Sequence, residues 1–453
     1  MNLILIYDEM ERKMDNLSLK KRDLKHIWHP CSQMKDYERL PLIPIKSAKG
    51  VYLEDFEGKK YIDAISSWWV NLFGHQHPYI KQMIKEQLDC LEHVIFAGFT
   101  HEPIIRLSER LVEITPSNLT KCFYADNGSS AIEVAIKMSF HYNKNRGLTK
   151  PYFVSLENSY HGETIGALSL GDLGIYKESY EELLIRSIKS EVPRDQSEEE
   201  AKRAADALKR LFEERSEEIS AFVVEPLVQC AGGMHMYSPL FLKLASELCK
   251  EFDIHFIADE IAVGFGRTGS MFACEQADVK PNFMALSKGI TGGYLPLSVV
   301  LLEDKMYDSF YCDYNLNKSF LHSHSYTGNA LACAAANAVL DIFENEDILE
   351  KNRKKSAYIN KKLQKFLELK NVKSVRQTGM IAAITLRGYP TQERIGLRVY
   401  EYGLKKGVLL RPLGNVIYFM PPYIITEEEI DKMMDTAYEA ISLLPPVEPN
   451  LET

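Results

Sequence analysis

Short apolar segments alternate with longer amphipathic segments between residues 104 and 300, and this alternation constrains the fold more than any other feature. The clearest strand patterns cover residues 121–125, 152–155, 221–224 and 255–258. Helical patterns cover residues 129–145, 198–217 and 239–252. Such alternation predicts a mostly parallel sheet with helices on both faces. Because ligands bind at the carboxyl ends of the strands in such sheets, the loops that follow these strands are the expected ligand site.

The pattern changes near residue 371, where strands are predicted over 380–386, 408–411 and 416–420 between helices. This part indicates a smaller α+β domain. A hairpin over residues 50–64, with its turn at Glu57-Gly58, is expected to join that domain. The predicted organisation is an N-terminal extension without regular structure (1–24), an N-terminal part of the small domain (25–75), a large ligand-binding domain (76–340) and a C-terminal small domain (341–453).

Charge and composition exclude several classes of protein. The net charge of −9 argues against a nucleic-acid-binding surface. No run approaches the roughly 18 apolar residues of a membrane-spanning helix, so no membrane association is expected. The eight cysteines include no C-x-x-C pair, which is typical of reduced thiols in a cytoplasmic protein.

Lys288 is the residue that most suggests a chemistry. It lies among small and apolar residues in the segment 285–293, and a strand pattern upstream ends at Asp259-Glu260. A lysine of this kind suits an imine with pyridoxal phosphate, and a nearby acid suits the role of holding the pyridine nitrogen protonated. Taken singly, Lys288 also fits a solvated surface lysine, and the two acids fit a solvated carboxylate pair.

Four other segments offer groups that suit such a site. Gly128 and Ser129 open a helix after a strand, where backbone amides and the helix dipole favour a phosphate; a plain N-cap is the alternative. Tyr160 offers a ring that would stack on a flat heterocycle, unless it is a core tyrosine. Glu225 ends the strand before that of Asp259 and is expected to lie beside it. Arg411 has the planar fork that clamps a carboxylate, although a surface arginine is the alternative.

Two literal motif matches are rejected. Residues 264–269 match G-x-G-x-x-G, but no convincing helix follows them, so we predict a loop rather than a dinucleotide site. The pairs His75/His77 and His322/His324 lack the helical spacing and cysteine partners of a strong zinc site, so we predict no metal.

The combined motifs resemble the class III aminotransferases of fold type I. The shared segments, in family order, are 127–133, 159–162, 225–226, 259–269, 287–289 and 325–329. The resemblance implies a seven-stranded, mostly parallel sheet between helices and a homodimer with shared active sites. It also implies that pyridoxal 5'-phosphate is bound through Lys288.

The same resemblance implies roles for individual residues. Asp259 would face the pyridine nitrogen, with Tyr160 and Ile261 on opposite faces of the ring. Gly128 and Ser129 would hold the phosphate. Ser325 would reach the phosphate from the partner chain. His324 is also expected to bind the cofactor, and Ser323 the substrate.

Flanking segments resemble the branch of this family that serves biotin synthesis. They are residues 27–30, 66–69 and 411–423. This resemblance implies 8-amino-7-oxononanoate as amino acceptor, with Trp68 and Tyr418 lining its aliphatic chain and Arg411 binding its carboxylate.

The donor is expected to be S-adenosylmethionine, with lysine as the alternative. Cys31 stands where many users of the former have tyrosine, Glu163 replaces a common aspartate, and Ser323-His324 replaces Gly-Pro. An ω-amino-acid aminotransferase, an aminomutase and a non-catalytic cofactor-binding regulator stay open as other readings.

Overall fold

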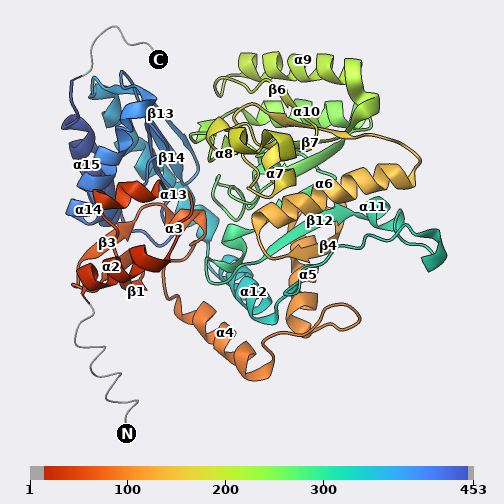
Figure 1. Ribbon diagram of the computed structural model, residues 1–453, viewed down its shortest axis with the longest axis horizontal. Helices are drawn as coiled ribbons and strands as arrows, with labels where there is room; N and C mark the ends of the chain where they lie inside the picture. The colour runs from red at the N-terminus through yellow and green to blue at the C-terminus, as the bar shows by residue number, and fades with distance from the viewer. Residues whose placement is uncertain (1–14, 447–453) are drawn as a thin grey trace.

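A seven-stranded sheet lies at the centre of the larger part of the molecule (Figure 1). The structure is a computed structural model that describes residues 15–446. The strands run in the order β4 (Leu119–Ala125), β12 (Ser298–Glu303), β11 (Phe283–Leu286), β10 (His255–Asp259), β7 (Ile219–Val224), β5 (Tyr152–Leu156) and β6 (Ser187–Ser190). All neighbouring pairs are parallel except those of β12, which runs antiparallel to both β11 and β4. The predicted mostly parallel α/β sheet is therefore confirmed.

Both faces of this sheet are buried, because two separate hydrophobic cores cover them. Ile257 of β10 points into a core with α6 (Gly128–Asn145) and α7 (Ile165–Leu170). Its neighbours Phe256 and Ala258 point into the other core, which includes residues of α10 (Pro239–Glu251) and α12 (Ala330–Asn345). Alternate side chains of one strand thus enter opposite layers, which explains the continuous apolar runs in the sequence.

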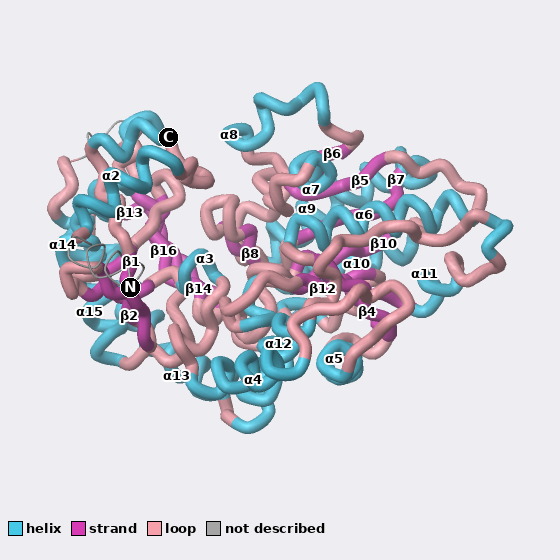
Figure 2. Tube along the Cα trace, turned by 60° about the horizontal axis from the view of Figure 1, so that its bottom comes forward, coloured by secondary structure: helices cyan, strands magenta, loops and turns pink. Residues whose placement is uncertain are grey.

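The helices begin where polar capping residues precede apolar periodicity. Asn127, Ser197 and Ser238 each accept a hydrogen bond from a backbone N–H of the first turn of α6, α9 (Glu198–Arg215) and α10, respectively. The charge-rich segment near residue 200 forms the helix predicted over 198–217, with Ala204 and Leu208 buried on its inner face. α4 (Pro78–Cys90) and α5 (Glu102–Ile114) pack beside α12 (Figure 2).

The two ends of the chain share the smaller part of the molecule, where the red and blue segments of Figure 1 lie together. One sheet has the order β1 (Ile45–Lys49), β2 (Tyr52–Asp55), β3 (Lys60–Asp63) and β15 (Val408–Leu409). A second sheet consists of β13 (Val372–Thr378), β14 (Ile381–Leu386) and β16 (Val416–Phe419). Helices α13 (Ile348–Leu363), α14 (Gly396–Lys406) and α15 (Glu427–Ser442) accompany them. The predicted hairpin turns at Glu57-Gly58 as expected, but β15 ends two residues before Arg411.

The prediction that the N-terminal extension lacks regular structure is wrong for residues 16–24. Residues 15–24 were expected to lack regular structure, whereas α2 covers Asn16–His26. Its N-terminus is fixed by Asp15, whose Oδ1 accepts from the backbone N–H of Ser18 at 2.6 Å. Residues 1–14 of the predicted extension lie outside the described residues.

The segment Gly264–Gly269 is a loop of turns, as predicted. Arg267 in this loop is fully buried and donates to the carbonyl oxygens of Asn71 and Pro421. The loop thus joins the large sheet to both small-sheet regions. Within residues 15–446, no helix combines the length and apolar character needed to cross a membrane.

Candidate active site

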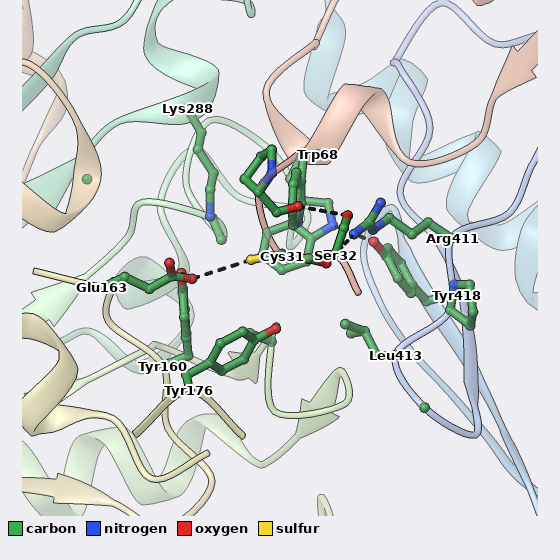
Figure 3. Close-up of a pocket in the computed structure, with 18 of the residues that line it drawn as sticks. Cys31, Ser32, Trp68, Tyr160, Glu163, Tyr176, Lys288, Arg411, Leu413 and Tyr418 are labelled. Atoms are coloured by element: carbon green, nitrogen blue, oxygen red, sulfur yellow. Dashed lines mark hydrogen bonds between the residues drawn. The ribbon is translucent and has the colours of Figure 1, made fainter. Parts of the chain in front are cut away.

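One cavity of about 650 Å³ lies at the carboxyl ends of the parallel strands. Lining groups follow directly after four of these strands, at Tyr160 beyond β5, Glu225 beyond β7, Asp259 at the end of β10 and Lys288 beyond β11. Its opposite wall comes from the two ends of the chain (Figure 3). This is the ligand position that the sheet topology predicts.

The Lys288 side chain points into this cavity from the loop after β11 (Figure 3). Its Nζ lies 4.4 Å from the ring centroid of Trp69. Burial lowers the pKa of the Lys288 amine, and the nearby thiol of Cys230 and carboxyls of Asp259 and Glu225 only partly oppose this. A lowered pKa increases the neutral amine, which is the nucleophilic form.

The Asp259 carboxylate is held from two sides. His161 Nδ1 lies 2.8 Å from Oδ2, and the backbone N–H of Ile261 donates to Oδ1 at 3.1 Å. All of these groups are buried. The imidazole therefore fixes the direction in which the carboxylate faces the cavity.

Glu225 is a second buried carboxyl beside Asp259. It accepts hydrogen bonds from the backbone N–H groups of Tyr160 and Cys230, both at 3.0 Å. Burial, followed by the repulsion of Asp259, raises the pKa of Glu225 to about 8. The predicted neighbourhood of the two acids is present, and the backbone bonds tie Glu225 to the loop that carries Tyr160.

A concave cradle forms where α6 begins. Asn127 Oδ1 caps the helix by accepting from Ser130 N–H at 3.0 Å. A Cβ at Gly128 would lie 3.0 Å from Ile261, and a Cβ at Gly162 would lie 2.1 Å from Ser129 Oγ. The absence of side chains at both glycines keeps the helix N-terminus open, where amides and the helix dipole attract an anion.

Tyr160, Glu163 and Cys31 meet at one side of the cavity. The Tyr160 hydroxyl donates to Glu163 Oε1 at 3.0 Å, and the Cys31 Sγ lies 3.6 Å from the same oxygen. Burial and the Glu163 carboxylate raise the pKa of the Cys31 thiol. Tyr176 adds an edge-on contact with the Tyr160 ring, with centroids 5.7 Å apart. This side therefore combines aromatic surface with one carboxylate.

Arg411 and Trp68 form the other side. The guanidinium carbon of Arg411 lies 4.6 Å from the Trp68 ring centroid, and Arg411 Nη2 donates to the carbonyl of Cys31 at 3.3 Å. The Tyr418 hydroxyl accepts from Trp69 Nε1 at 3.1 Å. Figure 3 shows Arg411 and Tyr418 entering from the C-terminal strands, facing Trp68 and Cys31. An arginine stacked on an aromatic ring keeps its donors directed sideways, toward an anionic ligand.

The structure brings most of the predicted site residues to this cavity. Those that line it are Cys31, Trp68, Gly128, Ser129, Tyr160, Glu225, Asp259, Ile261, Lys288, Arg411 and Tyr418. Ser323, His324 and Ser325 do not line it within the described chain. Instead, the Nε2 atoms of His324 and His322 lie 3.1 Å apart, and the Ser325 carbonyl oxygen lies 2.8 Å from His93 Nε2. The role of Ser325 from a partner chain, cofactor binding by His324 and substrate binding by Ser323 stay predictions.

Three contributors to the site were not assigned roles from the sequence. His161 lies within the quoted motif beside Tyr160, and its position next to Tyr160 was the available signal. Trp69 lies next to Trp68, yet the sequence did not indicate that the two rings would face different groups. Tyr176 gave no signal, because it lies in the short helix α8 (Gly174–Lys177) without a motif.

Comparisons with known proteins agree with this geometry. The family model described as "Aminotransferase class-III" matches residues 33–441. The chain is 54% identical over 433 residues to an adenosylmethionine-8-amino-7-oxononanoate aminotransferase of Helicobacter pylori, covering 94% of this chain and 98% of that protein. The crystal structure of a protein of the same name from Methanocaldococcus jannaschii superposes with a TM-score of 0.91 at 39% identity, covering 94% and 99%. An (S)-enantioselective omega-transaminase from Thermomicrobium roseum gives 0.90 at 28% identity, covering 95% and 99%.

Proposed function

Because this chain belongs to the class III aminotransferase family, we propose that it transfers an amino group to 8-amino-7-oxononanoate, forming 7,8-diaminononanoate for biotin synthesis. The proposed amino donor is S-adenosylmethionine. The observation that carries this proposal is a single cavity that joins Lys288 and Asp259 to Arg411 and Tyr418. The first pair suits amino transfer, and the second pair suits an acceptor with an apolar chain and a carboxylate.

Pyridoxal 5'-phosphate is the cofactor that we propose, and the residues present fit it. The side-chain-free cradle at Gly128 and Gly162 suits its phosphate, and the neutral amine favoured at Lys288 suits its covalent attachment. The buried carboxylate of Asp259 suits its ring nitrogen. When bound, the cofactor supplies a protonated ring that withdraws electrons from the reacting carbon.

The proposed contributions of the protein are binding, orientation and proton transfer. Lys288 Nζ moves a proton to and from the reacting carbon of the substrate. Asp259, oriented by His161 at 2.8 Å, would hold the ring nitrogen of the bound cofactor. Tyr160 and Ile261 line the same cavity and would pack against the ring. The donor reacts first and leaves, and the acceptor then enters the same cavity.

The acceptor half of the cavity supports the substrate assignment. Arg411 has its guanidinium over Trp68, with no carboxylate among its hydrogen-bond partners in residues 15–446. A substrate carboxylate would therefore find an arginine without a competing acid. Trp68 and Tyr418 would exclude water from the aliphatic chain between this carboxylate and the reacting carbon.

The donor assignment has one competitor. Both S-adenosylmethionine and lysine carry a side-chain cation, and the Glu163 carboxylate in the donor half suits either one. With Cys31 in place of the tyrosine expected at this position, the Glu163 side of the cavity has one aromatic ring fewer for binding the donor. Lysine is therefore the second donor that we propose to test.

We also propose a homodimer in the cytoplasm. Support for a partner surface comes from side chains that are largely exposed in the single chain, with Tyr314 at 91% and Leu321 at 89%. Their exposure is expected if a second chain covers them. All eight cysteines lie in the described residues and are free, as a reducing compartment would leave them.

The test of the proposed function is a direct assay. Purified holoenzyme is incubated with 8-amino-7-oxononanoate and either S-adenosylmethionine or lysine, and 7,8-diaminononanoate is measured. We expect formation with S-adenosylmethionine. If the product forms with lysine but not with S-adenosylmethionine, lysine is the donor. If it forms with neither, the substrate assignment is refuted.

A further inference from the structure

Residues Ser66–Trp69 form a left-handed turn at the wall of the cavity. Their φ angles are 51°, 48°, 72° and 74°, although none of the four is glycine. No other run of four consecutive residues of this kind occurs within residues 15–446. Side chains with a Cβ disfavour this conformation, and such residues normally occur singly. Something in the surrounding structure must therefore hold the turn.

The buried carboxylate of Asp63 is in the position to do so. It accepts from Ser67 at both the backbone N–H (2.9 Å) and the hydroxyl (2.6 Å). His75 Nε2 lies 3.0 Å from Oδ2, the oxygen that also accepts from the Ser67 hydroxyl. The Asp63 side chain is fully buried, so water does not compete for these bonds. Ser66 adds one further contact, because its hydroxyl donates to the carbonyl of Met420 at 2.7 Å.

The handedness of this turn decides where two adjacent tryptophan rings point. Trp68 faces the guanidinium of Arg411, whereas Trp69 faces Lys288 Nζ and donates to the Tyr418 hydroxyl. In a right-handed turn successive side chains would rotate in the opposite sense, and both pairings would be lost. The turn therefore connects the lysine side of the cavity with the arginine side.

We propose that Asp63, through its bonds to Ser67 and its backing by His75, is a positioning residue that sets substrate specificity by holding this left-handed turn. Asp63 does not line the cavity itself, so it acts only through Trp68 and Trp69. Its loss is expected to weaken binding of an acceptor with a long apolar chain more than it slows turnover. This inference rests on the proposed function for its choice of substrate.

The test replaces Asp63 by asparagine in the holoenzyme. Asp63→Asn keeps the shape but leaves one accepting oxygen in place of two, so the Ser67 N–H and the Ser67 hydroxyl no longer have separate acceptors. We expect KM for 8-amino-7-oxononanoate to rise about tenfold or more while kcat changes less than about threefold. Equal KM values for the acceptor in Asp63→Asn and wild type would overturn the proposal.

Asp55 supplies a matched control. It is also buried and accepts from Glu57 N–H, Lys59 N–H and the Tyr61 hydroxyl, each at 2.9 Å, but in the hairpin away from the cavity. Asp55→Asn should lower the unfolding temperature as Asp63→Asn does, with KM unchanged. An equal rise in KM in both variants would mean that general destabilisation is the cause, and the proposal would fail.

A glycine substitution separates strain from a simple lost bond. Glycine has no preference against left-handed backbone. Both a Ser67→Gly and a Ser67→Ala background lack the hydroxyl bond to Asp63, so the difference between them isolates backbone strain. Asp63→Asn should raise KM by less in the Ser67→Gly background than in the Ser67→Ala background. If the two backgrounds respond alike, holding the turn against strain is not the role of Asp63.

A spectroscopic readout makes the inference independent of the substrate. The chain has three tryptophans, so a Trp28→Phe background leaves Trp68 and Trp69 as its only indole rings, and the Asp63→Asn difference spectrum in the indole region reports on them. Asp63→Asn should then lose most of the near-ultraviolet circular dichroism of the two rings, while Asp55→Asn keeps it. If wild-type protein fails to aminate the acceptor, the proposed function fails, and this measurement still decides the fate of the turn.

Discussion

Lys288 Nζ lies 4.4 Å from the centre of the Trp69 ring, although the two residues follow strands of different sheets. The lysine follows strand β11 of the large sheet, and the tryptophan closes a strained turn after β3 of a small sheet. An aromatic face stabilises an ammonium only weakly, so burial still lowers the pKa of Lys288. The contact thus shields the reacting amine from water without removing its reactivity.

Replacing Lys288 by alanine is expected to abolish turnover. Lys288→Ala removes both the covalent attachment point and the proton-transferring amine, so the rate should fall roughly 10³-fold or more. The visible absorbance of the lysine-bound cofactor should disappear as well. Lys189→Met is the matched control, because burial lowers the pKa of Lys189 to about 7 but its partners are Ser155, Ser169 and Leu170. Retained absorbance in Lys288→Ala would contradict the assignment.

Replacing Arg411 should act on the acceptor. Arg411→Met removes a charged pair to the substrate carboxylate that is worth about 1.5–3 kcal/mol, or roughly a 10- to 100-fold rise in acceptor KM. The donor half-reaction, followed by single-turnover absorbance, should change little. Arg394 also lines the cavity but is already paired with Asp36 at 2.7 Å, so Arg394→Met is the comparison. Equal effects of the two substitutions would argue against the carboxylate role.

Replacing Glu163 should act on the donor. Glu163→Gln keeps the side-chain shape and removes the carboxylate that faces the cavity, so KM for a cationic donor should rise about 10-fold or more. Cys31→Ala is the control on the same wall. It removes the Cys31 Sγ atom that lies 3.6 Å from Glu163 Oε1, and should change the donor KM less than about threefold. A donor KM that is unaffected by Glu163→Gln would remove Glu163 from the donor site.

The raised pKa of Glu225 predicts a pH dependence of stability in the cofactor-free protein. Its pKa is about 8 in the folded chain against an ordinary 4.5. The folded state therefore holds a proton that the unfolded state has lost between these values. The contribution is fully present below about pH 4.5 and is lost as pH rises to about 8, at up to about 1.4 kcal/mol per pH unit.

Thermal unfolding of wild type and Glu225→Gln at several pH values measures this contribution. Glutamine cannot lose a proton, so the stability of the variant relative to wild type should grow as pH rises from about 5 to 8. Glu260 is the matched group, because burial raises its pKa to about 7, it accepts from the Ala273 and Cys274 backbone N–H groups, and it does not line the cavity. Glu260→Gln should show a similar trend without altering cofactor absorbance. A stability difference independent of pH would disprove the raised pKa of Glu225.

Local patterns predicted most of the large sheet. Strands such as β7 and β10 are continuous apolar runs between turns, and the structure buries every residue in them. The same pattern carries no direction, which is why the antiparallel course of β12 was not predicted. α2 was missed because its helix exposes a largely polar sequence, in which no residue is buried. Its start depends on the single cap at Asp15.

The candidate site divides in a similar way. Lys288, Asp259 and Gly128 each lie in a short motif, and each motif by itself predicts a chemical role. The His161–Asp259 contact joins residues that are 98 positions apart, so no local pattern contains it. The left-handed turn at Ser66–Trp69 carries no glycine to signal it. Positive φ angles there depend on Asp63 and its neighbours rather than on the residues of the turn.

The α/β class, the motif groups and the family follow from local sequence, because apolar periodicity and short motifs are properties of neighbouring residues. Which groups meet depends on how distant segments pack. Parallel strands that are distant in sequence end at one edge, and the two chain ends supply the opposite wall with Trp68 and Arg411. Distances across that cavity, the burial that lowers the pKa of Lys288 and the strain held by Asp63 arise from packing between segments, which no single segment encodes.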